Sequence, residues 1–268
     1  MLFTRNVLLL GAALVLGSAL GASAADLGNG SLKDAPVMEP MPAASAGWYA
    51  RVDGGYNWFM TPDFSAGDLG TPDSKMGGAW SVGGGLGYYF GRGFRGDITV
   101  DHLFDAEAQT GLLCSCTVVG TTKFDVSSTV VLANLYYDFN RGGRFNPYIG
   151  GGVGFSHNET SSVQLTDPCG CTAGYDGKSS NSFAAAAMAG VSWRIRGGGT
   201  TYVGGLKDRP VAVSEGNALY LDFGYRFLYL GQAETGSVFV PLAGESVTPK
   251  AKDLIANELR VGLRYDLN

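Results

Sequence analysis

The C-terminal segment is the feature that most restricts how this chain can fold. Residues 257–268 read NELRVGLRYDLN, with an apolar residue at every second position from Leu259 to Leu267. In an extended strand this alternation places the apolar side chains on one face and charged side chains such as Glu258 and Arg260 on the other. A strand with one apolar and one mostly charged face is typical of a β-barrel in lipid.

The N-terminal segment indicates export. Arg5 precedes an apolar stretch over residues 7–20, and residues 22–24 read ASA, which together predict a signal peptide over residues 1–24. An uncleaved anchor helix is the alternative. The apolar stretch is shorter than the roughly 18 residues that a spanning helix needs, and glycines interrupt it.

The composition differs from that of a typical soluble domain, and the apolar residues are dispersed along the chain after the N-terminal segment. Charged residues make up 16% of the chain, below the roughly 25% of soluble domains. Glycine is abundant, with 42 of 268 residues, and aromatic residues reach 12%. The formal net charge of −5 and the lack of a basic run argue against a nucleic-acid partner.

Two parts follow the signal peptide. Residues 25–46 contain Pro36, Pro40 and Pro42 among small polar residues, which predicts a flexible periplasmic tether. Residues 47–268 form the predicted barrel domain. Its alternating segments are residues 48–58, 80–90, 94–104, 129–139, 147–156, 183–195, 219–229 and the C-terminal strand.

The connections between these segments alternate in length, as in an outer-membrane barrel. The connections at residues 91–93 and 140–144 are tight. Residues 197–216 break the alternation, and a hidden hairpin there would make ten strands. This segment has too few residues for two further strands of about 9–11 residues each, the length that spans a membrane. The long connections are residues 60–77, 105–123, 157–181 and 231–253.

The sequence therefore predicts an all-β fold, an eight-stranded antiparallel up-and-down transmembrane β-barrel with short periplasmic turns and long extracellular loops. A soluble barrel or sandwich is the alternative, because alternation alone does not say which face points inward. Aromatic residues at both ends of the apolar face favour two lipid–water boundaries. They are Trp48, Tyr88, Phe90, Phe94, Tyr137, Phe139, Trp193 and Tyr265 at the short-turn end, and Trp58, Trp80, Phe104, Phe155, Phe183, Phe227 and Tyr229 at the long-loop end.

The polar face predicts an ion network inside the barrel. Its acids and bases are nearly balanced, and its bases are all arginine, which suits buried bidentate pairing. We expect a cross-linked plug, since eight strands enclose a lumen that side chains fill; a charged ion path is the alternative. The predicted network comprises Arg51, Asp53, Arg95, Asp97, Asp101, Asp138, Arg194, Asp222, Arg226, Glu258, Arg260 and Arg264.

The cysteines form two C-x-C pairs in the second and third long loops. These are Cys114 with Cys116, and Cys169 with Cys171. Export through an oxidising compartment favours disulfides, and bridges between the loops are expected because a C-x-C bridge closes a strained ring. Three connectivities remain open. A zinc site is the alternative, although the spacing departs from C-x₂₋₄-C.

Charge also differs between the two ends of the predicted barrel. The long loops are mostly acidic, which suits the divalent cations that bridge lipopolysaccharide, and the short turns are mostly basic, which suits anionic lipid headgroups. A merely solvated surface explains the loop charges equally well.

No catalytic constellation is evident. The two histidines are His102 and His157, and Ser156 and Glu159 lie beside the second. Neither histidine has the neighbours that a triad requires. We expect no catalytic residue, no cofactor and no metal.

Several motifs in order resemble the opacity-protein-like outer-membrane barrels of Gram-negative bacteria, especially the alphaproteobacterial major surface antigens. The chain departs from their pattern in the long 197–216 turn and in its last residues, where an aromatic is usual. The motifs are residues 24–27 (AADL), 47–50 (GWYA), 134–139 (NLYYDF), 147–154 (PYIGGGVG), 223–227 (FGYRF) and 261–265 (VGLRY).

The resemblance implies a non-enzymatic integral protein of the bacterial outer membrane, inserted by the barrel-insertion machinery among outer-membrane lipids and lipopolysaccharide. We expect a structural surface role with loops displayed for interaction. The alternatives are a surface binder of haem or host matrix, and a narrow porin-like channel.

Overall fold

The computed structural model describes most of the chain after residue 46. The described residues are 47–65, 74–114, 117–166, 172–198, 200–203, 211–214, 216–240, 245–248 and 250–267.

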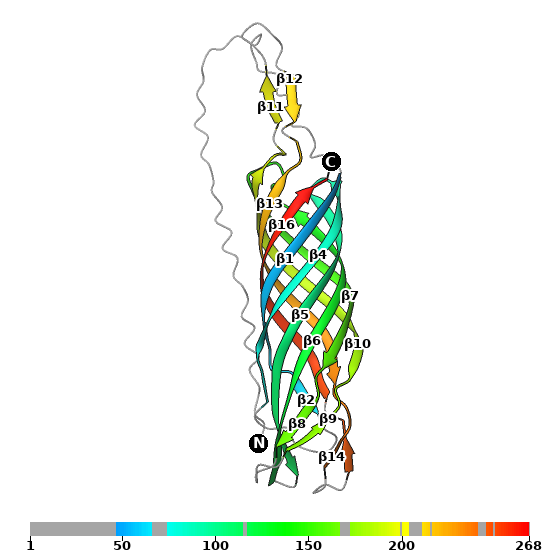
Figure 1. Cartoon of the computed structure of the whole chain (residues 1–268). Helices are drawn as coiled ribbons and strands as arrows, with labels where there is room; N and C mark the ends of the chain where they lie inside the picture. The colour runs from blue at the N-terminus through cyan, green and yellow to red at the C-terminus, as the bar shows by residue number, and fades with distance from the viewer. Residues whose placement is uncertain are drawn as a thin grey trace, which may run out of the picture. The chain divides into compact units, whose positions relative to one another are not determined.

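Eight long antiparallel strands of the described chain close into a barrel (Figure 1). Each strand pairs with the next long strand along the chain, and the last pairs with the first, so no long strand is left as an edge. This closure confirms the predicted eight-stranded up-and-down fold. The strands are β1 (Gly47–Phe59), β4 (Gly78–Gly91), β5 (Phe94–Cys114), β6 (Thr117–Asp138), β7 (Phe145–Thr160), β10 (Ser179–Arg196), β13 (Leu219–Glu234) and β16 (Lys250–Asp266).

The strands extend further at the long-loop end than the sequence pattern predicts. Residues 105–123 were expected to form a loop, but β5 and β6 remain paired as far as Cys114 and Thr117. The expectation was wrong because this stretch loses the apolar and polar alternation once it leaves the membrane. Backbone pairing, which does not depend on side-chain polarity, continues through it.

Short strands extend this end of the barrel. Pairing of β3 to β5 and of β8 to β6 continues the barrel wall beyond the membrane, and β9 pairs with β8. β2 pairs with β16, and β14 pairs with β15. Their bounds are β2 (Asp63–Ser65), β3 (Lys75–Met76), β8 (Val163–Thr166), β9 (Thr172–Tyr175), β14 (Val238–Val240) and β15 (Glu245–Val247).

The long turn at the other end contains a separate hairpin. β11 (Thr200–Val203) and β12 (Val211–Ser214) pair with each other in a sheet of their own. Four-residue strands are far shorter than the roughly 9–11 residues that cross a membrane. The turn therefore contains a hairpin without adding two strands to the barrel.

The barrel's outer face carries its apolar side chains. The two predicted aromatic groups lie outside, and Trp48 and Phe90 at one end, with Trp80 and Phe183 at the other, are more than half exposed. Apolar side chains between them, such as Ile98, are exposed as well. This arrangement suits a barrel surrounded by lipid. Among the described residues, no helix is long and apolar enough to cross a membrane.

Glycines on the inner wall make room for large side chains and for the backbone of neighbouring strands. A Cβ atom at Gly83 would overlap the carboxylate of Asp101 on the neighbouring strand. At Gly154, a Cβ atom would overlap the backbone carbonyl oxygen of Val131. Part of the high glycine content is thus a packing requirement of the filled interior.

Substitution of Gly154 by alanine is expected to lower the free energy of unfolding by about 1–3 kcal/mol, since the paired backbone of Val131 cannot move aside without strain. Gly142→Ala is the matched control, because a Cβ atom there has nothing within 4 Å. Equilibrium denaturant unfolding in lipid vesicles measures both. Equal stability of the two variants would contradict this account of the inner glycines.

Candidate functional site

Charged side chains fill the half of the barrel nearer the short turns. Arg226 contacts two carboxylates, with Nη1 at 2.8 Å from Asp101 Oδ2 and Nε at 2.6 Å from Glu258 Oε2. Arg260 Nη2 lies 3.2 Å from Asp101 Oδ1 and 3.1 Å from Asp53 Oδ2. These residues come from β1, β5, β13 and β16, so the ion pairs connect strands across the interior.

The network continues toward the short turns. Arg51 donates to both oxygens of Asp53, at 2.7 and 2.8 Å, and its Nη1 lies 3.2 Å from Asp97 Oδ2. Arg95 lies 3.9 Å from Asp97 and 3.2 Å from Asp138. The pairs therefore form one chain of alternating charges from Glu258 to Asp138.

A second pair lies beside this chain. Arg264 donates from Nε to Asp222 Oδ2 at 3.0 Å and from Nη2 to Ser192 Oγ at 2.8 Å. Arg264 also donates to the hydroxyl of Tyr89. Eleven of the twelve residues predicted for the network are at most 6% exposed and are paired in this way.

Arg194 is the exception. It is half-buried at the short-turn end of β10, where the register with β13 shifts, and its Nη1 donates to the Gly198 carbonyl at 3.0 Å. The structure therefore corrects its predicted place in the network. Its strand position beside the buried Tyr220 agrees with the predicted inward face, but its guanidinium donates to the backbone of the turn.

A layer of tyrosines surrounds the arginines near the short turns, and the sequence reasoning missed most of it. The Arg95 guanidinium lies 3.9 Å from the ring centroid of Tyr136, and that of Arg264 lies 4.5 Å from the ring centroid of Tyr220. The detectable signal was the Tyr-Tyr doublets at residues 88–89 and 136–137, since alternation directs one ring of each doublet inward. The buried rings are Tyr49, Tyr89, Tyr136, Tyr148 and Tyr220.

An apolar layer fills the half of the interior nearer the long loops. The polar face of the sequence gave no indication of this layer, because its residues belong to stretches where the alternation weakens. It consists of Leu103, Ala108, Phe124, Val126, Val130, Leu132, Val163, Ala184, Leu228, Leu230, Ala233, Ala251, Leu254 and Ala256, all buried.

A partly exposed ion cluster at the long-loop rim connects the ends of β13 and β16 with Lys178, the residue before β10. The Glu234 carboxylate accepts from Lys178 Nζ at 2.8 Å and from Lys250 Nζ at 2.7 Å. Glu234 lies outside the membrane-spanning part, and these two hydrogen bonds lower the pKa of its carboxyl to about 2. The Glu234 carboxylate therefore remains ionised at physiological pH.

Ser156 and His157, neighbours in the sequence, do not converge in the structure. Ser156 points into the barrel, fully buried, and its Oγ donates to the Leu230 carbonyl at 2.7 Å. The neighbouring His157 points outward and contacts Asn181 and Glu159. The barrel wall thus separates the serine from the histidine. Within the described residues, no group of three or more His, Cys, Asp or Glu is arranged to hold a metal ion.

The predicted disulfides involve residues that are mostly outside the described ones. Cys116, Cys169 and Cys171 are not described, and only the backbone of Cys114 is described, at the end of β5. Their pairing stays a prediction.

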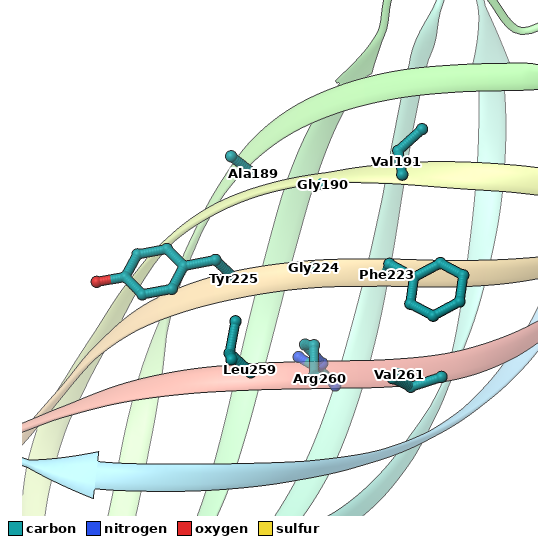
Figure 2. A pocket seen from close by; sticks show the side chains of 9 residues that line it. All are labelled: Ala189, Gly190, Val191, Phe223, Gly224, Tyr225, Leu259, Arg260 and Val261. Atoms are coloured by element: carbon teal, nitrogen blue, oxygen red, sulfur yellow. The ribbon is translucent and has the colours of Figure 1, made fainter. Parts of the chain in front are cut away.

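A shallow apolar groove of about 470 Å³ lies on the outer wall at mid-height (Figure 2). Figure 2 shows Ala189 and Val191 on β10 facing Phe223 and Tyr225 on β13. The groove forms because small residues, Ala189, Gly190 and Gly224, stand beside the aromatic side chains of Phe223 and Tyr225. Its lining offers little polar surface, so it suits an acyl chain better than a reaction.

Comparison with known proteins identifies the family. Residues 11–266 match the family model described as "Outer membrane protein beta-barrel domain". The chain belongs to this family. As a family member it is an integral protein of the outer membrane, and the apolar outer face described above is its lipid-contacting surface.

Three relatives are similar over most of the length of the chain. Proteins of Brucella abortus, Brucella suis and Brucella melitensis, each called an uncharacterized protein, are 31% identical over 93% of this chain and 94% of their own length.

The barrel is also similar to solved structures of outer-membrane proteins. Neisserial surface protein A is 19% identical, with 82% of this chain and 97% of that chain covered and a TM-score of 0.40. OprG from Pseudomonas aeruginosa is 15% identical, with 83% and 97% covered and a TM-score of 0.45.

Proposed function

We propose that this protein is a non-enzymatic, structural barrel whose lumen is closed and whose extracellular strands are displayed for interaction. The observation that supports this best is the burial of the interior. A lumen wide enough for water would leave its lining accessible, yet the eleven paired network residues are at most 6% exposed and the apolar layer is buried. A water-filled path through the barrel would require side chains of both the ion network and the apolar layer to move.

The proposed surface role is supported by the part of the sheet beyond the aromatic residues. There β5 and β6 continue as a hairpin, flanked by β3 on one side and by β8 and β9 on the other. Backbone pairing restricts a hairpin, so it presents its side chains at a lower entropic cost than an unpaired loop. Outer-membrane lipids, lipopolysaccharide and the barrel-insertion machinery are the proposed partners.

The processing of the N-terminus belongs to the same proposal. Residues 1–24 would be removed as a signal peptide, and residues 25–46 would serve as a periplasmic tether. N-terminal sequencing of the protein purified from outer membranes tests this, with Ala25 expected as the first residue.

Purified protein in planar lipid bilayers is expected to produce no steady ionic conductance, since both interior layers exclude water. A known porin reconstituted in the same way is the positive control. Stable conductance steps from the folded barrel, verified as folded by its faster gel migration before boiling, would overturn the closed-lumen proposal and favour the channel alternative.

A further inference from the structure

Polar side chains form a row across four neighbouring strands on the outer wall of the barrel. His102 on β5 is in register with Thr129 on β6, Thr129 with His157 on β7, and His157 with Asn181 on β10. All four are half-buried or exposed and face outward. At about 4.8 Å between strands, the row is about 14 Å wide. It contains both histidines of the chain.

Hydrogen bonds hold these side chains in place. His102 Nδ1 lies 3.0 Å from Thr129 Oγ1, and His157 Nδ1 lies 2.6 Å from Asn181 Oδ1. His157 Nε2 lies 3.2 Å from Glu159 Oε1. The row is therefore an ordered polar surface.

The row crosses the aromatic boundary at the long-loop end of the outer wall. Phe155 and Phe183 pair across β7 and β10, two residues on the membrane side of His157 and Asn181, and belong to the aromatic residues of the long-loop end. On β5, Phe104 of the same group lies two residues beyond His102, so His102 stands just within the aromatic boundary and His157 and Asn181 stand just past it. One step past such an aromatic boundary, a side chain leaves the hydrocarbon and meets the polar headgroups. Headgroups of the outer leaflet are thus within reach of the His157 and Asn181 end of the row.

The charges around the row decide which headgroup fits. Beyond it on the same outer face lie Glu107, Asp125 and Glu159, opposed there by Lys123, which is 3.9 Å from Glu107. This excess of carboxylates repels an anionic phosphate and accepts hydrogen bonds from hydroxyl groups. The imidazole, hydroxyl and amide groups of the row donate and accept in the same way.

We propose that the His102–Thr129–His157–Asn181 row binds the hydroxyl-rich sugar headgroup of a glycolipid in the outer leaflet. The sugar hydroxyls bond to the row, and the acyl chains lie along the apolar wall below Phe155 and Phe183. This inference deepens the proposed structural role, on which it rests, because a bound glycolipid would fix the barrel within the outer leaflet.

The two histidines provide a direct probe. The full barrel, with its histidine rings isotope-labelled, is reconstituted in phosphatidylcholine vesicles, and the two imidazole signals are followed by NMR. Three additions are compared: a diglycosyl diacylglycerol, phosphatidylglycerol, and a free disaccharide. The glycolipid is expected to shift both signals saturably, whereas phosphatidylglycerol and the free disaccharide leave them in place.

A variant pair tests the site. Asn181→Leu removes the amide from the row and also removes the hydrogen bond between Asn181 and His157. It is expected to weaken glycolipid binding about tenfold, the equivalent of roughly 1.4 kcal/mol. Asn257→Leu is the matched control, since Asn257 faces outward on β16, bonded to Tyr225 on another part of the wall. It should bind as the unaltered barrel does.

Four outcomes would overturn the inference: no shift with the glycolipid, an equal shift with phosphatidylglycerol, an equal shift with the free disaccharide, or equal weakening by the two asparagine variants. An equal shift with phosphatidylglycerol would assign the row to anionic lipids, and one with the free disaccharide to a soluble glycan. The proposed function is tested separately by conductance. A barrel that conducts ions but still shows the glycolipid shift would contradict the closed lumen and leave the glycolipid site standing.

Discussion

Replacement of Arg226 by methionine is expected to lower the free energy of unfolding by about 3–5 kcal/mol, the usual consequence of removing one partner of a buried ion pair. Arg226 is fully buried and contacts both Asp101 and Glu258. Arg260 still contacts Asp101, and Ser81 still donates to Glu258. Neither supplies the lost positive charge, so the variant leaves excess negative charge in a dry interior.

Equilibrium denaturant unfolding in vesicles, followed by tryptophan fluorescence, measures this loss. Arg196→Met is the matched control, because Arg196 is exposed at the end of β10 and its replacement should change stability by no more than about 0.5 kcal/mol. Addition of Glu258→Gln to Arg226→Met should recover part of the loss by removing the uncompensated charge. A loss no greater than that of Arg196→Met would mean that the interior is hydrated.

The sequence predicts which residues of the membrane-spanning part face inward because the side-chain period of a strand is two. A residue such as Asp97 cannot share a face with Ile98. Eleven network residues therefore lie where the alternation places them. Alternation does not specify which acid meets which base, because that depends on the stagger between strands. The contact of Arg226 on β13 with Asp101 on β5 is of this kind.

The sequence was less informative where other forces decide the structure. The tyrosine layer escaped notice because tyrosine suits both an aromatic boundary and a buried arginine contact, so residue type alone does not distinguish Tyr88 from Tyr89. The extension of β5 and β6 beyond the membrane was missed for a different reason. Backbone pairing sustains those strands after the apolar pattern has ended.

Leu228→Ala is expected to lower the free energy of unfolding by about 2–5 kcal/mol, since a large side chain would leave a cavity in a closely packed layer. Leu228 on β13 is fully buried within the apolar layer. Leu135→Ala makes the same chemical change on the outer wall, where Leu135 is 53% exposed. Lipid chains can fill the space there, so a smaller loss is expected.

Leu228→Ala also tests whether a lower free energy of unfolding is accompanied by opening of the lumen. If the ion network and the apolar layer each exclude water, Leu228→Ala should remain non-conducting in planar bilayers despite its lower stability, because the arginines and carboxylates beneath are untouched. Conductance should require that both layers be opened, as in a barrel that combines Leu228→Ala with Arg226→Ala and Glu258→Ala. Steady current through the single variant would show that the apolar layer alone closes the lumen and that the charged half already admits water.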